Sequence, residues 1–339
     1  YYIFMIRIKI NDIDVHRVET TFRPYLQPKV LSLFNDIGVE FVFSGGCELI
    51  WVCQASRQFR RPYGWWFKEG YKSVYFDGHD SASLYGSWEN VKDGRFIKLI
   101  KNSLYSDSLH YSTESAFGRI YWGKSENQAE NYKLNIIPPF ELSGVNWLST
   151  VKPTWYDYRK INKPVDVCAL FQWKSTKSNY EYGKRSDHIY DAYRLKFINE
   201  LKKLRDTTSL NIVMLDGQEK LPIDQYYAYM QHSKVIVAPF GYGEIAPRDL
   251  EASMFGSILI KPDMNHISTY PNPYNDETTI FCKWDASDLT EKIEYAISNF
   301  NQLQESYVEA FRQSYISQSD PEQLVMHTYQ WLKDLPMFC

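Results

Sequence analysis

The chain has 339 residues, enough for about two ordinary domains, so a single small binding module is not expected. Its 38 lysines and arginines against 41 aspartates and glutamates give a net charge of −3, which provides no bulk attraction for a nucleic acid. Hydrophobic residues at 44% indicate a folded globular protein, and the unusual feature is the aromatic fraction of 17%. Aromatic faces can stack on sugars or bases, although most belong to the core.

The cysteines and the opening segment bear on the compartment. Five cysteines are scattered without metal-ligand spacing, which predicts reduced thiols and no metal site. The apolar opening run is interrupted at Arg7 and is far shorter than a membrane-spanning helix. We therefore expect a soluble, cytoplasmic protein without a transmembrane segment.

The first half of the chain carries short strand-like runs. Strands are expected at residues 3–10, 39–43, 49–53 and 73–76, and a helix at 28–37. Prolines between residues 136 and 164 disfavour regular elements and suit a linker, with a boundary near 150–164. We predict an N-terminal α/β lobe over residues 1–155.

The second half alternates strands with helices. Strands are expected at 165–171, 210–215, 234–238, 257–260 and 279–282, and helices at 186–204, 223–232, 247–255 and 289–300. This order predicts a parallel sheet with helices on both faces, over residues 156–318. A last helix, within residues 319–339, is expected to pack back on the first lobe.

A glycine loop lies between a strand and a helix within residues 238–263. Gly241 and Gly243 allow the backbone to approach a ligand, and the N–H groups of the following helix favour an anion. Arg248, in the first helical turn, can bind a phosphate or carboxylate with its forked guanidinium. Glu251, three residues later on the same face, can accept hydrogen bonds from the paired hydroxyls of a ribose. The alternative is an exposed Arg248–Glu251 ion pair beside ordinary turns.

These residues belong to a longer pattern. In chain order it consists of Tyr227, Met230, Ser233-Lys234, Pro239, Gly241, Arg248, Glu251-Ala252, Gly256 and Pro262. Over about residues 165–300, and most specifically over 226–263, the chain resembles the C-terminal half of GT-B glycosyltransferases, particularly exostosin-like and group 1 enzymes.

The resemblance implies two Rossmann-like lobes facing across a cleft, with the donor bound mainly by the second lobe. It implies that Glu251 holds the donor ribose, and that Gly241, Tyr242, Gly243 and Glu244 approach the diphosphate or the transferred sugar. Retaining group 1 enzymes often have two glutamates separated by seven residues. Here Glu244 and Glu251 are separated by six, so the role of Glu244 and the stereochemical outcome both stay open.

A second cluster follows the first strand of the second lobe. Ligands bind at the carboxyl ends of the strands in such sheets, so Lys174 or Arg185 could place a cation near a leaving diphosphate. The alternative is a solvated lysine-rich loop. Of the two residues, Arg185 is the preferred candidate.

A third cluster, Asp77, His79 and Asp80, follows a strand of the first lobe. Crowded carboxylates and an imidazole raise one another's proton affinity, which suits a base that removes the proton of an acceptor hydroxyl. An ordinary turn with a helix-capping aspartate is the alternative.

The sequence thus predicts a glycosyltransferase that moves a hexosyl or pentosyl group from a nucleoside diphosphate sugar to a glycan or glycoconjugate hydroxyl. No metal or resident cofactor is expected, and no nucleic acid partner. Two other functions stay open: a non-catalytic glycan- or nucleotide-binding protein of the same fold, and a metal-dependent GT-A enzyme.

Overall fold

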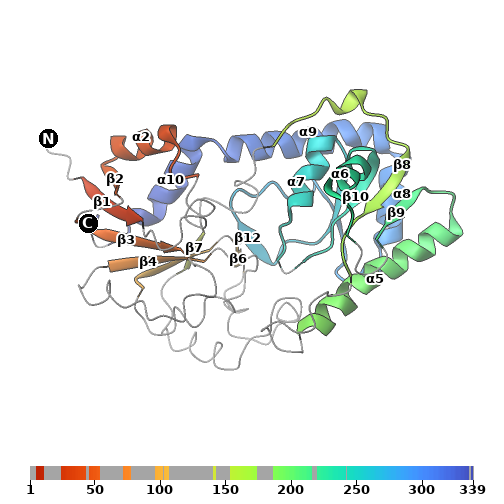
Figure 1. Cartoon of the computed structure of the whole chain (residues 1–339), viewed down its shortest axis with the longest axis horizontal. Coiled ribbons are helices and arrows are strands. Elements are labelled where there is room, and N and C mark those ends of the chain that lie inside the picture. Colours follow the sequence, from red (N-terminus) through yellow and green to blue (C-terminus); the bar gives the residue numbers. More distant parts are fainter. Residues whose placement is uncertain are drawn as a thin grey trace.

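Two parallel β-sheets with their helices make up the computed structural model (Figure 1). The structure describes residues 5–10, 24–42, 46–53, 72–77, 96–101, 103–106, 140–142, 153–173, 186–215, 220–241, 243–335 and 337–338.

The first sheet has six strands in the order β2-β1-β3-β4-β5-β7, and each neighbouring pair is parallel. Its strands are β1 (Ile6–Ile10), β2 (Val39–Val42), β3 (Leu49–Cys53), β4 (Lys72–Asp77), β5 (Lys98–Lys101) and β7 (Phe140–Leu142). Helix α2 (Pro28–Asp36) begins at a proline, whose fixed φ suits the first helical position, and it buries Val30 and Phe34.

The core of the first lobe is built around Trp51, which is completely buried. The ring centroid of Trp51 lies 5.2 Å from that of Tyr25 and 4.8 Å from that of Phe76. Trp331 approaches the same ring to 5.7 Å from helix α10 (Pro321–Leu332). The C-terminal helix therefore completes a core that the N-terminal residues begin.

The second sheet has five strands in the order β13-β11-β10-β8-β9, again parallel at each neighbouring pair. Its strands are β8 (Val165–Ala169), β9 (Ile212–Met214), β10 (Ser233–Val237), β11 (Ile258–Pro262) and β13 (Ile280–Cys282). The helices between and after them are α5 (Ser186–Thr207), α6 (Ile223–Gln231), α7 (Pro247–Phe255) and α8 (Leu289–Ser298). All residues of β11 are buried, as expected for a strand covered on both faces.

Two structures join the lobes. Helix α9 (Phe300–Gln318) runs along the top of Figure 1 and leads into α10, on the first lobe. Below it, β6 (Ser103–Tyr105) pairs antiparallel with β12 (Ile267–Thr269), so that a strand from each half of the chain forms a two-stranded ribbon. The ribbon ties the second lobe to the first.

The predicted fold class, two Rossmann-like α/β lobes, is confirmed by the two parallel sheets and their alternating helices. Within the part of the chain that the structure describes, no helix combines the length and apolar character needed to cross a membrane.

Candidate functional site

The candidate site lies at the carboxyl ends of β8 and β10. These strands are neighbours, but the chain continues from β8 to β9 on one side and then returns to β10 on the other. The loops that leave the two strand ends therefore diverge and open a crevice, which is where doubly wound sheets bind ligands. Residues 170–173 follow β8, and residues 238–246 lead from β10 into α7.

The first turn of α7 is fixed by Asp249, which is completely buried. Its Oδ2 accepts hydrogen bonds from the backbone N–H of Ala246 at 3.0 Å, from Lys261 Nζ at 2.8 Å and from the Tyr274 hydroxyl at 2.8 Å. Burial lowers the pKa of Lys261, and the adjacent Asp249 carboxylate opposes this shift. Asp249 thus anchors the helix that carries Arg248 and Glu251.

Arg248 occupies the second position of α7, with its guanidinium carbon 6.0 Å from the centroid of the Phe171 ring. Its Nη1 is buried and has no hydrogen-bond partner among the described residues. A buried charged donor without an acceptor is costly, and the positive end of the helix dipole adds repulsion. The arrangement is one that an anion would complete.

Glu251 lies one turn further along α7 and is partly buried. Its Oε2 accepts a hydrogen bond from the Tyr226 hydroxyl of α6 at 2.6 Å. Burial raises the pKa of the Glu251 carboxyl above its usual 4.5, while Tyr226 and Arg248 lower it. The tyrosine therefore orients a carboxylate whose charge the site only partly stabilises.

The glycine loop forms a tight turn in which the Gly241 N–H donates to the Gly243 carbonyl at 2.9 Å. Glu244 follows and is completely buried. Within the described part of the chain its carboxylate oxygens have no hydrogen-bond partner, although His266 Nε2 lies 3.7 Å from Oε1. The Glu244 carbonyl accepts a hydrogen bond from Lys261 Nζ.

The structure thus brings together Arg248, Glu251, Gly241, Gly243 and Glu244 around the β10–α7 loop. Tyr242, Lys174 and Arg185 lie outside the described residues.

The predicted base cluster is only partly described. Asp77 ends β4, where it is in register with Lys101 of β5, so its backbone lies at the carboxyl edge of the first sheet. Its side chain and the whole of His79 and Asp80 lie outside the described residues.

Three residues at the site were not predicted as site residues. Tyr226 lies directly before Tyr227 of the sequence pattern and had no assigned role, whereas His266 and Arg194 gave no signal, because their contacts come from residues far away in the sequence. Arg194, in α5, donates hydrogen bonds to the carbonyls of Gln172 and Phe240.

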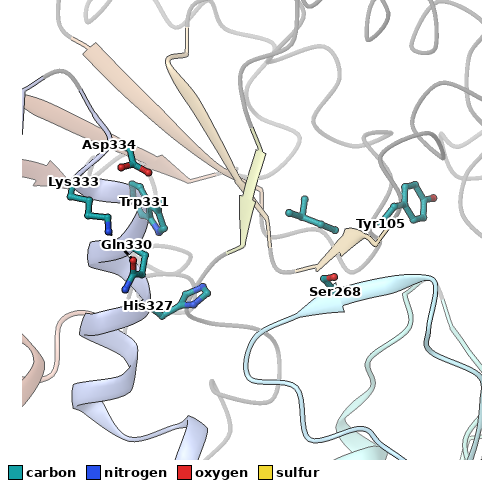
Figure 2. Close-up of a pocket in the computed structure, with 8 residues that line it drawn as sticks. Tyr105, Ser268, His327, Gln330, Trp331, Lys333 and Asp334 are labelled. Carbon is teal, nitrogen blue, oxygen red and sulfur yellow. Dashed lines mark hydrogen bonds between the residues drawn. The ribbon is translucent and has the colours of Figure 1, made fainter.

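A pocket of about 540 Å³ lies where the two lobes meet (Figure 2). Figure 2 shows side chains of α10 on one side and those of the β6–β12 ribbon on the other. The lining residues are Leu104, Tyr105, Ser268, His327, Gln330, Trp331, Lys333 and Asp334. Most of these side chains are polar, so the pocket suits a polar ligand better than an apolar one.

Among the described residues, no group of three or more His, Cys, Asp or Glu side chains is arranged to hold a metal ion.

No protein-family model matches the chain, and no curated protein matches it. Among solved structures, a glycosyltransferase from Rickettsia africae is 12% identical with a TM-score of 0.45, over 98% of this chain and 99% of the other. An alpha-glucosyltransferase in complex with UDP is 12% identical with a TM-score of 0.49, over 97% and 100%. Sucrose-phosphate synthase from Thermosynechococcus elongatus is 12% identical with a TM-score of 0.44, over 97% and 98%. Likeness at this level assigns no activity, donor or acceptor to this chain.

Proposed function

We propose that this protein transfers a sugar from a nucleoside diphosphate sugar to an acceptor hydroxyl, and that it needs no metal ion to do so. The observation that carries the proposal is the Nη1 atom of the half-buried Arg248, which is itself buried and lacks a hydrogen-bond partner among the described residues, one helical turn from Glu251. The resemblance of residues 226–263 to exostosin-like and group 1 GT-B glycosyltransferases supports the same function.

Arg248 is the proposed diphosphate ligand. A nucleoside diphosphate carries negative charge next to its ribose, and the Arg248 guanidinium belongs to the first turn of α7, at the positive end of the helix dipole. A phosphate oxygen on Nη1 would satisfy the buried donor and offset its charge. Binding therefore removes an unfavourable feature of the free protein as well as adding contacts.

Glu251 is the proposed ribose ligand. Residues three apart on a helix have Cβ atoms about 5–6 Å apart, which is comparable with the distance from a nucleotide's phosphate to its ribose hydroxyls. The Tyr226 hydroxyl already occupies Oε2, so the carboxylate is oriented before the donor arrives. Neighbouring hydroxyls can then donate to the acceptor positions that remain.

The chemical step would follow from this placement. The acceptor oxygen attacks the anomeric carbon, the bond to the diphosphate breaks, and the diphosphate leaves with the electron pair. Arg248 and the positive end of the α7 dipole stabilise the charge that develops on the leaving group, which is the role a metal ion has in other transferases. If the anomeric carbon inverts, a base must take the acceptor proton, and Asp77, His79 and Asp80 are the predicted candidates.

The pocket of Figure 2 is the proposed entry for the acceptor. Ser268 of β12 lines this pocket, and two residues earlier, in the turn before the strand, His266 lies beside Glu244 of the glycine loop. The pocket and the glycine loop are therefore connected through residues 266–268. Gln330→Ala is therefore expected to raise the KM for the acceptor and to leave the KM for the donor unchanged.

A thermal-shift panel over UDP, GDP, CMP and dTDP, with their sugar conjugates, tests the donor assignment. A ligand that binds only the native state raises the melting temperature of the protein, so one nucleotide is expected to stabilise the wild type. The wild-type protein is expected to hydrolyse the sugar conjugate of that nucleotide or to transfer its sugar. Arg248→Ala and Glu251→Ala should lose both effects.

The matched control is Arg205→Ala, which removes an arginine that is exposed in the last turn of α5. The proposal fails if no nucleotide stabilises the wild-type protein. It also fails if Arg248→Ala binds the nucleotide as well as the control does. Stabilisation without consumption of any donor would favour a binding protein of the same fold instead.

A further inference from the structure

Arg194 is a buried arginine that connects the two loops of the candidate site. It lies in α5 and is only 5% exposed. Its Nε donates to the Phe240 carbonyl at 2.8 Å, and its Nη1 donates to the Gln172 carbonyl at 2.6 Å. One guanidinium thus bonds to the loop after β10 and to the loop after β8.

The two acceptors occupy matching positions along the strands. Ile236 of β10 is in register with Cys168 of β8, and Phe240 and Gln172 each lie four residues further on. The strands have ended by then and their chains diverge, so the guanidinium takes the place of the hydrogen bonds that a continuing sheet would make. Arg194 therefore sets the distance between the two walls of the crevice.

Two further contacts place Arg194 beside groups of the proposed diphosphate site. A Cβ added to Gly241 would lie 3.1 Å from Nη2 of Arg194, a tight contact that would press on the guanidinium. The guanidinium carbon of Arg194 lies 5.5 Å from the centroid of the Phe171 ring, and the carbon of Arg248 lies 6.0 Å from the same centroid. Displacing Arg194 would disturb both the turn and the ring against which Arg248 rests.

We infer that Arg194 is a positioning residue for donor binding, which holds the ends of β8 and β10 at the spacing that the diphosphate needs. The inference rests on the proposed function and deepens it, because it assigns a role to a side chain in α5, outside the β10–α7 motif. The residue acts through the carbonyls of Gln172 and Phe240 and through Phe171.

The fork of the guanidinium is essential to this role. Its Nε and Nη1 lie on different atoms of one rigid plane and reach two carbonyls at a set separation, whereas the shorter lysine side chain carries all its donors on one nitrogen. Arg194→Lys keeps the charge and most of the side-chain volume but is expected to release one of the two loops. Gly241→Ala keeps Arg194 itself and crowds it instead.

The test compares Arg194→Lys and Gly241→Ala with the control Arg205→Lys, using calorimetric binding of the nucleotide that stabilises the wild type. In Arg194→Lys the calorimetric Kd for the nucleotide is expected to rise about tenfold, since a hydrogen bond from a charged donor is lost. In turnover kinetics the donor KM should rise by a similar factor, while kcat changes far less. The double variant should be less than additive, because both changes disturb the same contact. Arg205→Lys should match the wild type.

The outcomes separate this inference from the proposed function. If Arg248→Ala abolishes nucleotide binding while Arg194→Lys binds as the wild type does, the inference is wrong and the proposed function stands. If Arg248→Ala binds normally, or if the wild type binds no nucleotide, both fall. A fall in kcat as large as the rise in KM, together with a lower melting temperature, would show a general structural role for Arg194 and would also overturn the inference. Circular dichroism on each variant identifies any that fails to fold, and Gly241→Ala then decides the result.

Discussion

Arg248 and Glu251 are both incompletely stabilised by the residues around them in the free protein. The Nη1 atom of Arg248 is buried without a hydrogen-bond partner among the described residues, and burial raises the pKa of Glu251. Neither feature stabilises the free protein. Such departures from good packing and pairing concentrate at functional sites, where a ligand supplies what is missing.

Because the pKa of Glu251 is raised, removing its charge should affect the stability of the protein and its nucleotide binding in opposite directions. Because the folded pKa lies above the unfolded one, the protonated form is favoured in the folded protein, and this contribution is lost as pH rises through the folded pKa. At pH 7 the ionised carboxylate therefore destabilises the folded state. Glu251→Gln is expected to melt at the same or a higher temperature than the wild type and to bind the donor nucleotide more weakly.

The same shift affects binding in mildly acidic solution. Wild-type affinity for the nucleotide should fall as pH is lowered toward the raised pKa, because a protonated Glu251 accepts fewer hydrogen bonds. Titration calorimetry at several pH values on the wild type and on Glu251→Gln measures this difference. A Glu251→Gln curve that falls as steeply as the wild-type curve would show that another group controls the effect.

Lys163 provides a second residue-scale prediction. Its buried ammonium donates to the carbonyls of Gln231, Ser233 and Phe255 at 2.8–3.0 Å, and so joins the ends of α6 and α7. Burial, with a smaller contribution from Arg312, lowers the pKa of Lys163 to about 7. Between this value and the unfolded pKa near 10.5, the unfolded chain binds more protons, so stability rises with pH.

The measurement is the free energy of unfolding in urea from pH 6.5 to 8.5, for the wild type and for Lys163→Met. Above pH 7 the free energy of unfolding of the wild type is expected to rise relative to that of the variant by at most about 1.4 kcal/mol per pH unit. The range stops below pH 9, where the buried cysteine Cys168, with its raised pKa, begins to contribute with the opposite sign. A constant difference across the range would contradict the assignment.

At the scale of elements, α7 is held at both ends. Asp249 fixes its first turn, and Arg312 of α9 donates to the carbonyls of Ser253 and Met254 at its last turn. The helix ends at Gly256, with φ at 74°, a conformation that side chains rarely adopt. The helix that presents Arg248 is therefore held at its first turn by Lys261 of β11 and Tyr274, and at its last turn by Arg312.

Gly256→Ala is expected to destabilise the second lobe strongly, because the added Cβ would lie 2.0 Å from Cβ of Tyr158 in addition to the backbone strain. We expect a loss of at least about 3 kcal/mol, combining strain and overpacking. Gly46→Ala is the control, since its Cβ would make an ordinary contact at 3.7 Å with Arg7 Nη2. Urea unfolding of both variants checks the prediction, and equal losses would contradict it.

The elements of the second lobe could be predicted because strands covered on both faces are continuous apolar runs, such as residues 235–238 and 258–260. In the first lobe β5 was missed, because Lys98 and Lys101 give it a polar appearance although both are buried. Strands β6 and β12 were also missed. Each has only three residues, and each finds its partner on the other half of the chain, which no local pattern can reveal.

The candidate site divides in the same way. Gly241, Arg248 and Glu251 are close in sequence, so their spacing on one loop and helix was enough to bring them together. Arg194 is 46 residues from Phe240, and His266 is 22 residues from Glu244. Contacts over such separations depend on how α5 and β12 pack, and the sequence pattern contains no information on that packing.

At the scale of the whole molecule, the two lobes share structure. Trp331 of α10 is 2% exposed and packs on Trp51 and Phe76 of the first lobe, after α9 has crossed from the second. Trp331→Ala is expected to cost about 3–5 kcal/mol, the usual range for a large buried aromatic side chain. The loss should appear in the first lobe, so nucleotide binding by the second lobe should persist below the unfolding midpoint.

Urea unfolding followed by tryptophan fluorescence, with calorimetric nucleotide binding at low urea, measures both parts of that prediction. The control is Met326→Ala on the same helix, whose side chain is 57% exposed. Loss of nucleotide binding in folded Trp331→Ala would show that the first lobe contributes directly to the donor site.

In the proposed function, Arg248 and Glu251 bind the two ends of a nucleoside diphosphate. A crystal structure of the protein with the nucleotide that stabilises it tests this most directly. We predict a phosphate oxygen within hydrogen-bond distance of Arg248 Nη1 and a ribose hydroxyl on the Glu251 carboxylate. A nucleotide bound elsewhere, with Arg248 Nη1 still unpaired, would contradict the account.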